Sequence, residues 1–324
     1  MAMAGTAFSI RPVDLADIDQ WLALRNQAYI WPAQRELFLF SESLRLPGEP
    51  VLRVGAWTAD GKLAATAEAY VGEDGERWVE RAEGFVTVAP PYRRQGLGRQ
   101  LAGEVEKFAN DLELHWLEAP LFERHLALAW SLLGPGKFVE LERYQESMQQ
   151  PSTVPMTGLG ELRERLARSG IETGAFSEID SAAARKELYR CAMEIEHAMP
   201  HEPLVEWRDP PYENWERKVF QRPGSSSDSI LVARDGERII GLSYLVMRDT
   251  GDAEVGDTGV LQTHRRRGIA RALKLMATRW AAEHGIPRVH TDNRTDNAGM
   301  LALNTELGFK PGEVIVVFEK TLRS

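Results

Sequence analysis

Two segments of the chain combine arginines with closely spaced glycines. Residues 88–98 read Val-Ala-Pro-Pro-Tyr-Arg-Arg-Gln-Gly-Leu-Gly, and residues 260–270 read Val-Leu-Gln-Thr-His-Arg-Arg-Arg-Gly-Ile-Ala. The first turn of a helix carries N–H groups without intrahelical partners and a partial positive charge. Glycine lets an anion approach this backbone, and arginines add charge-assisted hydrogen bonds. At the start of a helix, such a segment suits a pyrophosphate.

The residues around both segments predict the elements that would hold them. An apolar run precedes each segment, at 84–88 and at 258–261, and reads as a strand. The apolar residues that follow have helical spacing; they are Leu97, Leu101, Val105 and Phe108 in one half and Ile269, Leu273, Met276 and Trp280 in the other. The glycine spacing is neither that of a P-loop nor that of a Rossmann fingerprint.

The two segments belong to a repeat of a whole domain. Gly96 and Gly268 lie just over half the chain length apart. Upstream of each, two apolar runs flank an Asp-Gly turn, a strong hairpin signal; the runs are 51–57 and 63–70, then 230–233 and 239–246. We therefore expect two tandem domains at 1–150 and 171–324, with a linker and bracing helix at 151–170.

At these residues the sequence resembles the GCN5-related N-acetyltransferase (GNAT) superfamily, whose signature is Arg/Gln-x-x-Gly-x-Gly/Ala after the fourth strand. The matching residues are Arg93, Gly96 and Gly98 in the first half and Arg265, Gly268 and Ala270 in the second. The arrangement is similar to tandem acetyltransferases such as mycothiol synthase. The resemblance implies an α/β (α+β) fold with two tandem GNAT-like domains. Each would be a mixed, mostly antiparallel sheet flanked by helices, with a splayed central pair of strands.

The resemblance also implies where acetyl-coenzyme A, the expected acyl donor, would bind. The loop would hold the pyrophosphate, and the fourth strand would pair with the pantetheine arm between the splayed strands. The coenzyme-contacting residues would be Val88, Arg93, Arg94, Gln95, Gly96, Leu97, Gly98 and Arg99 in the first half, and Val260, Leu261, Arg265, Arg266, Arg267, Gly268, Ile269, Ala270 and Arg271 in the second.

The second half carries a further asparagine-rich block. Residues 289–291 read as the fifth strand, and a helix follows from about 297 to 307, with Gly308 suited to the left-handed position after it. This block is similar to the family stretch Asn-x-x-Ala-x-x-x-Tyr-x-x-x-Gly-Phe. The resemblance implies coenzyme contacts for Asn297 and also for Asn293.

Asn304 stands where the family usually has a tyrosine that acts as general acid. An amide can hydrogen-bond the sulfur, but it cannot donate a proton as an acid does. The corresponding stretch of the first half, 115–139, contains no asparagine. We therefore expect the second domain to be catalytic and the first to be non-catalytic.

Transfer to an amine also needs a group that accepts a proton. Glu254 and Asp257, on the strand before the second loop, are the ionisable residues nearest the expected chemistry. They lie three positions apart, so in a regular strand they point to opposite faces and only one faces the substrate. The resemblance favours Glu254. Asp292 on the fifth strand is a weaker candidate.

The first helices of the second half and their loop are the expected acceptor site, because the family usually binds its substrate there. The candidate residues are Glu196, His197, His201, Trp207 and Tyr212. Acids, imidazoles and aromatic rings together would suit a cationic or polar small molecule.

Composition narrows the possible partners. The net charge of −9 argues against a general nucleic-acid binder. The single cysteine, Cys191, allows no disulfide within the chain, and no metal-ligand pattern is present. We see neither a signal peptide nor an apolar run near the roughly 18 residues of a membrane span. These features predict a cytoplasmic protein without membrane partners, as a monomer or homodimer.

Three functions remain open from the sequence. The first is an N-acetyltransferase that uses acetyl-coenzyme A and a small-molecule amine. The second keeps this chemistry but acts on a protein or peptide amine. The third is a regulatory module that binds coenzyme A without catalysis.

Overall fold

The computed structural model describes residues 8–30, 32–71, 77–78, 80–134, 137–198, 207–248 and 250–323. The chain divides into two compact units. Unit 1 comprises Met1–Tyr144, Val205–Arg208 and Val314–Ser324, and unit 2 comprises Gln145–Leu204 and Asp209–Glu313. Among the described helices, none combines the length and apolar composition needed to cross a membrane.

Unit 1 contains a sheet with helices on it. Its elements are β1 (Phe8–Pro12), α1 (Ile18–Arg25), α2 (Arg35–Leu44), β2 (Val51–Thr58), β3 (Leu63–Tyr70), β4 (Arg77–Trp78), β5 (Arg81–Val88), α3 (Leu97–Asp111), β6 (Trp116–Phe122), α4 (Leu126–Leu133) and β9 (Trp207–Arg208). Neighbouring strands follow the order β1-β2-β3-β5-β6-β14, where β14 is Lys310–Thr321. In this series β5 and β6 are parallel and the other pairs are antiparallel.

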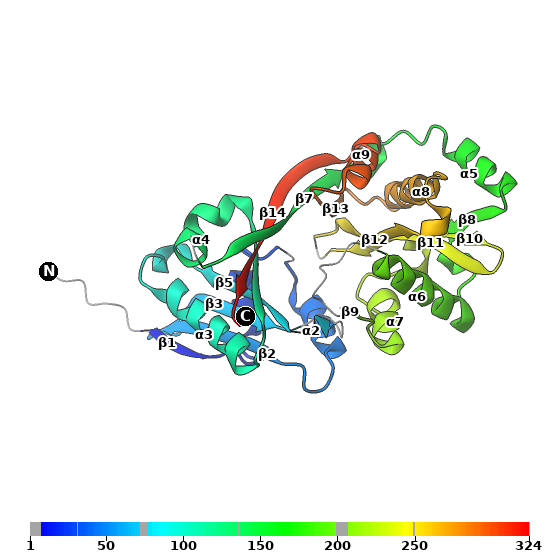
Figure 1. Cartoon of the computed structure of the whole chain (residues 1–324). Coiled ribbons are helices and arrows are strands. Elements are labelled where there is room, and N and C mark those ends of the chain that lie inside the picture. Colours follow the sequence, from blue (N-terminus) through cyan, green and yellow to red (C-terminus); the bar gives the residue numbers. More distant parts are fainter. Residues whose placement is uncertain are drawn as a thin grey trace. The chain divides into compact units, whose positions relative to one another are not determined.

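Unit 2 repeats this plan. Its elements are α5 (Leu159–Arg168), β8 (Ile171–Ala175), α6 (Ala182–His197), α7 (Tyr212–Phe220), β10 (Ile230–Asp235), β11 (Arg238–Met247), β12 (Ala253–Val260), α8 (Ile269–Glu283), β13 (Val289–Arg294) and α9 (Ala298–Glu306). Neighbouring strands follow the order β8-β10-β11-β12-β13, with β12 and β13 parallel and the other pairs antiparallel. Figure 1 shows α8 on one face of these strands and α6 and α7 on the other.

The predicted fold class is confirmed in both units. Leu101 and Val105 of α3 are buried in the core of unit 1, and Leu273 and Met276 of α8 are buried in that of unit 2. Each helix covers its sheet with the apolar stripe that helical spacing predicts. Burying these side chains removes apolar surface from water, which is the main favourable term in folding.

The turn and cap signals are also confirmed. Both Asp-Gly hairpins form, with Gly61 and Gly236 at positive φ. Asn297 caps α9 by accepting a hydrogen bond from the Met300 N–H at 3.2 Å, and Gly308 beyond the helix has φ 84°. These local features follow from side-chain chemistry at short range, which is why the sequence predicts them.

Two strands pass from one unit to the other. β7 (Val139–Gln149) begins in unit 1 and ends in unit 2, whereas β14 begins in unit 2 and ends in unit 1. Residues Ile315–Thr321 of β14 pair with β6. Within unit 2, the Gln145 amide donates to the carbonyls of Gly312 and Glu313. The predicted boundaries at 150 and 170 follow the sequence repeat and do not include this exchange.

Candidate functional site

The glycine loops of the two units have the same backbone conformation. Arg94 and Arg266 have φ of 63° and 64°, and the glycines two positions later, Gly96 and Gly268, both have φ 88°. Each glycine is the N-cap of the helix that follows. Left-handed residues next to a helix start turn successive N–H groups into one concavity, which favours an anion. The predicted elements around the loops are therefore confirmed, and their geometry suits a phosphate.

The first arginine of each loop ties it to the preceding strand. Arg93 Nε donates to the Val88 carbonyl at 3.0 Å, and Arg265 Nε donates to the Val260 carbonyl at 3.1 Å. The hydrogen bond spans five residues in both units and fixes the path of the turn. The side chains of these two arginines thus have a structural part in the loop, whatever else they bind.

The other residues predicted to contact the coenzyme are buried, ion-paired or exposed. Val260, Leu261, Ile269 and Leu97 are buried in the cores of their units, so their side chains support the loop from beneath. Arg271 pairs with Glu306 of α9. Gln95 and the remaining loop arginines, Arg94, Arg99, Arg266 and Arg267, are exposed. Coenzyme contact remains a prediction for all of them.

The strand that leads to the loop in unit 2 contains a β-bulge. Along the β11–β12 pair, Ser243 lies opposite Thr258 but Leu245 lies opposite Val255, so β12 has one extra residue between these pairs. A bulge leaves an extra residue outside the regular hydrogen-bond ladder and bends the strand. Gly256 lies at this point, and a Cβ there would come within 2.1 Å of the Tyr244 ring.

The bulge overturns one expectation for Glu254 and Asp257. Their spacing of three predicted opposite faces for a regular strand, but β12 is irregular between them. The extra residue resets the alternation of side chains, so both carboxylates lie on the same face. Asp257 accepts a hydrogen bond from the Tyr244 hydroxyl at 2.7 Å, and Glu254 accepts one from Arg248 Nε at 3.2 Å.

β12 and β13 separate beyond the level of Glu254. The parallel pairing joins Ala253 to Val289 and Glu254 to His290. Among the described residues, the pairing of β12 with β13 does not continue towards the loop, whereas β11 pairs with β12 as far as Val260. The structure thus has the splayed central strand pair that the resemblance implied.

Asn293 of β13 and Asn304 of α9 meet in unit 2. Asn304 Nδ2 donates to Asn293 Oδ1 at 2.6 Å, and Asn304 is only 2% exposed. Asn304 Oδ1 is buried without a hydrogen-bond partner in the described part of the chain. A buried acceptor of this kind carries a desolvation cost until a donor reaches it. The pair therefore fits a ligand with an N–H or S–H group.

Two ionisable groups in unit 2 with shifted pKa values are not the main candidates from the sequence: Asp292 is the weaker choice of base, and Lys274 has no predicted role. Burial, together with the negative charges of Glu254 and Glu146 and against the opposing effect of Arg248, raises the pKa of Asp292 to about 6. Burial lowers the pKa of Lys274 to about 8, and its ammonium lies 5.2 Å from the centre of the Phe309 ring. Both shifts depend on burial, which a sequence pattern does not report.

The predicted acceptor residues are brought together only in part. Glu196 and His197 lie at the end of α6, where His197 Nε2 is 2.7 Å from Asp209 Oδ1. Tyr212 begins α7 and donates from its hydroxyl to Glu216 at 3.0 Å. Trp207 is described only by its backbone, in β9 of unit 1. His201 lies outside the described residues.

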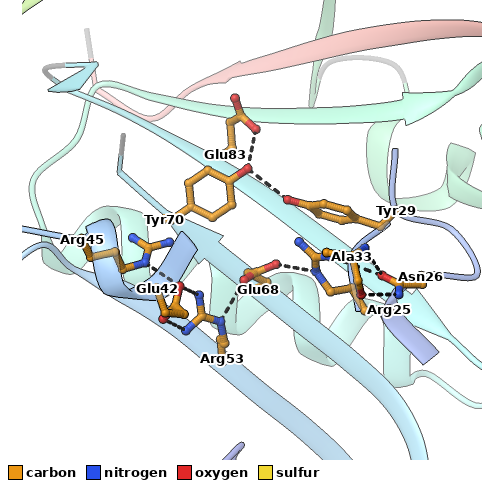
Figure 2. A network of polar contacts seen from close by, with 10 residues as sticks. All are labelled: Arg25, Asn26, Tyr29, Ala33, Glu42, Arg45, Arg53, Glu68, Tyr70 and Glu83. Carbon is orange, nitrogen blue, oxygen red and sulfur yellow. Dashed lines mark hydrogen bonds and ion pairs between the residues drawn. The ribbon is translucent and has the colours of Figure 1, made fainter. Parts of the chain in front are cut away.

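The corresponding face of unit 1 is filled by its own polar side chains (Figure 2). Glu68 is buried and accepts from Arg25 Nε and Arg53 Nε, each at 2.9 Å. Arg53 also donates twice to Glu42, which accepts from Arg45 at 2.8 Å. The arginines and carboxylates thus neutralise one another within the unit.

Aromatic side chains complete this face of unit 1. The Tyr70 hydroxyl donates to Glu83 at 3.0 Å and lies 3.2 Å from the Tyr29 hydroxyl. The Arg25 guanidinium lies 3.2 Å from the centre of the Tyr29 ring, whose other neighbour is Phe85 at 4.4 Å. Glu83 is at the last parallel pair of β5, the level that Glu254 has on β12.

One family model and several solved structures match this chain over most of its length. A model of the acetyltransferase (GNAT) family matches residues 17–125 and 188–309. A solved GCN5-related N-acetyltransferase from Sphaerobacter thermophilus has a TM-score of 0.72 at 19% identity, covering 98% of this chain and 96% of that one. A tandem GNAT protein from the clavulanic acid biosynthesis pathway has a TM-score of 0.69 at 17% identity, covering 98% and 99%.

A more distant structure shares the fold as well. N-myristoyltransferase of Saccharomyces cerevisiae, solved with bound myristoyl-CoA, has a TM-score of 0.59 at 12% identity, covering 98% of this chain and 80% of that one. No curated protein sequence matches this chain significantly. The structural matches show the fold, and the family model matches both halves and most of the chain. The chain therefore belongs to the acetyltransferase (GNAT) family, in its tandem form.

Proposed function

We propose that this protein transfers an acetyl group from acetyl-coenzyme A to the amine of a small molecule, and that unit 2 performs the reaction. The observation that carries the proposal is the combination, in unit 2, of the phosphate-suited loop with a bulged β12 that separates from β13. Family membership supports the reaction class. The acyl group and the acceptor are part of the proposal.

The loop and the splayed strands would hold the coenzyme. Backbone N–H groups around Arg266 and Gly268 would bind the pyrophosphate, with the loop arginines adding charge. The free edge of β12 would pair with the amides of the pantetheine arm. The Asn293–Asn304 pair fits the arm because Asn304 Oδ1 lacks a donor among the described groups. Asn297, whose side-chain oxygen caps α9, would contribute beside it.

Acetyl-coenzyme A supplies the acyl group as a thioester. The bulge of β12 would orient a backbone N–H towards the thioester carbonyl and stabilise the negative charge that develops there. Glu254 and Asp257 lie on the same face as each other and would place the acceptor amine against that carbonyl. Asn304 would hydrogen-bond the sulfur as the thiolate leaves.

The acceptor side favours a small amine. Glu254 and Asp257 would attract an ammonium group, and α6 and α7 flank the same strands with His197 and Tyr212. A protein or peptide amine is the competing acceptor. An enzyme for that substrate would accept lysine-containing peptides at least as readily as free amines.

Calorimetric titration with acetyl-coenzyme A and a thiol-release assay over a panel of amines and peptides test the proposal. The matched variants are Arg93→Ala/Gly96→Asp in unit 1 and Arg265→Ala/Gly268→Asp in unit 2. Each adds a negative charge at a loop position with the same φ. We expect the unit 2 variant to lose productive binding and at least about 100-fold in turnover.

The unit 1 variant is expected to retain turnover within about threefold of wild type, because loss of a site without catalysis leaves the reaction intact. The reverse pattern would assign catalysis to unit 1. Binding without turnover of any amine would support a regulatory module. Absence of binding in the wild type would refute the proposal.

A further inference from the structure

Asp292 lies on β13, two residues beyond the last pair that joins this strand to β12. That pair is Glu254 with His290. Side chains of a strand alternate, so Asp292 shares the face of His290 and hence of Glu254. Because the bulge also places Asp257 on this face, three carboxylates border the gap between the two strands. From this arrangement we propose that Asp292 is the catalytic base that deprotonates the acceptor amine.

The inference rests on the proposed function and differs from the expectation drawn from family resemblance. That resemblance favours Glu254 as the base. In the structure, Glu254 accepts a hydrogen bond from Arg248 and forms an ion pair with it. Asp257 accepts a hydrogen bond from the Tyr244 hydroxyl. Both carboxylates thus already have a donor beside them that holds their oxygens in place. These two residues are better suited to binding an ammonium than to deprotonating it.

Asp292 has different surroundings. Within the described residues, its carboxylate has neither an ion pair nor a side-chain hydrogen bond, and the hydrogen bond it does accept comes from its own backbone. His290 of β13, on the same face, contacts Glu146 and Asp252. The charged groups that act on Asp292 are Glu254 of β12, Glu146 of β7 and Arg248 of the β11–β12 turn. The carboxylates among them disfavour a further negative charge.

Burial and these charges give Asp292 the strength that a base needs near neutral pH. Burial raises its pKa to about 6, the negative charges of Glu254 and Glu146 act in the same direction, and Arg248 opposes them. The carboxylate is therefore ionised at pH 7 and still accepts protons more readily than an exposed aspartate. A base whose pKa lies close to the working pH combines availability with basicity.

The proton balance of the step is complete with the two substrates alone. An acceptor that arrives as an ammonium gives one proton to the Asp292 carboxylate, and the neutral nitrogen forms a bond to the thioester carbon. The carbon–sulfur bond breaks, and the sulfur leaves with its electron pair. A second proton from the nitrogen neutralises the thiolate. Asp292 then releases its proton to water, which restores the carboxylate.

The test compares the pH dependence of turnover in wild type, Asp292→Asn, Glu254→Gln and Asp296→Asn. Asp296 is an exposed carboxylate paired with Arg294 and serves as the matched control. We expect Asp292→Asn to lower kcat/KM by about 100-fold or more and to remove the fall in rate below about pH 6. Glu254→Gln is expected to raise KM for the amine, because a charge that binds the ammonium is lost, but to keep kcat, with the fall in rate displaced to lower pH because a repelling charge beside Asp292 is gone.

Two results would overturn the inference while the proposed function stands. One is Asp292→Asn with turnover within threefold of wild type and an unchanged acidic limb. The other is loss of turnover in Glu254→Gln with an active Asp292→Asn, which would assign the base to Glu254. If wild type binds acetyl-coenzyme A but turns over no amine, the proposed function fails and the inference fails with it.

A thermal melt separates a catalytic loss from a folding defect. The raised pKa means that folding disfavours the charged form of Asp292, so this residue lowers stability above about pH 6 and the penalty fades as pH falls towards the unfolded value. Asp292→Asn removes the penalty. Its melting temperature is therefore expected to exceed that of wild type at pH 8, with no gain at pH 4. A lower melting temperature at both pH values would indicate that Asp292→Asn misfolds. The displacement of the acidic limb in Glu254→Gln would then decide whether Asp292 is the base.

Discussion

Unit 1 and unit 2 share a loop but differ in the strand that leads to it. In unit 1, the β3–β5 register is regular from Ala65 opposite Val88 to Tyr70 opposite Glu83. In unit 2, the register between β11 and β12 shifts at Gly256 and Asp257. The loops beyond both strands have nearly identical φ angles. A phosphate-suited turn can thus form in a unit whose strand before the loop has no bulge.

A pair of glycines shows what the shift does to the strand. Gly84 on β5 and Gly256 on β12 lie at similar places before their loops. A Cβ on Gly84 would meet Val105 of α3 at 2.5 Å, whereas a Cβ on Gly256 would meet the Tyr244 ring of β11. One extra residue has therefore turned the glycine to the other side of the sheet. The same shift places Asp257 beside Tyr244, where unit 1 has Phe85 packed on Tyr29.

The two units also differ in how the carboxylates on this face are paired. Two carboxylates at this face of unit 1, Glu68 and Glu42, are paired with arginines of one network (Figure 2). In unit 2, Asp292 is half-buried at the corresponding side and, among the described residues, has no such cation in contact. The carboxylates Glu68 and Glu42 of unit 1 are neutralised within the unit, whereas Asp292 of unit 2 has no arginine of this kind beside it among the described residues. Three changes test this distinction.

The largest effect is expected from Glu68→Ala in unit 1. Removing this carboxylate leaves Arg25 and Arg53 buried without their shared partner, and such a loss costs about 3–5 kcal/mol. Urea denaturation followed by circular dichroism measures it. Turnover per folded molecule should stay at the wild-type value. A fall in turnover without a change in stability would mean that the network of unit 1 takes part in the reaction.

Gly256→Val is expected to lower turnover by about 10- to 100-fold, equivalent to roughly 1.4–2.7 kcal/mol in transition-state stabilisation. The new Cβ would displace the Tyr244 ring and with it the hydrogen bond to Asp257. The matched variant is Gly84→Val, which overpacks against Val105 and should cost about 1–3 kcal/mol of stability with turnover retained. Steady-state kinetics and thermal melts of both variants provide the comparison. Equal kinetic effects would show that the bulge confers no special role.

The smallest effect is expected from exchanging Asn304 of unit 2 with Leu132, which stands at the corresponding position of the repeat in unit 1. Asn304→Leu places in unit 2 the residue type that unit 1 has at Leu132, and it removes the partner of Asn293. Affinity for acetyl-coenzyme A should fall about tenfold, or roughly 1.4 kcal/mol, measured by calorimetry. The reciprocal Leu132→Asn should create no turnover. Unchanged affinity in Asn304→Leu would remove the amide pair from the coenzyme site.

The sequence predicts those parts of the molecule that depend on neighbours in the chain. The hairpins around Gly61 and Gly236, the Asn297 cap and the two glycine loops all form where the local pattern places them. Each depends on backbone preferences and side-chain hydrogen bonds within a few residues. The fold class follows because the same pattern occurs twice at domain spacing.

The face of unit 2 that carries the proposed base is less predictable because it depends on contacts between residues distant in the sequence. The bulge at Gly256 arises from the register of β12 against β11, so the alternation of a regular strand misplaces Glu254 relative to Asp257. The pKa of Asp292 reflects burial and the charges of Glu146 and Glu254, which are brought near it by tertiary structure. No spacing rule along one strand contains that information.

The exchange of β7 and β14 between the units has a consequence for the order in which the protein is made. Unit 1 begins at the start of the chain, but the strand beside β6 comes from Ile315–Thr321. A ribosome must therefore synthesise almost the whole of unit 2 before the sheet of unit 1 can be completed. Until then, β6 presents an edge with unpaired backbone groups, which is a site for aggregation or chaperone binding. The two copies, although related by repetition, cannot mature one after the other.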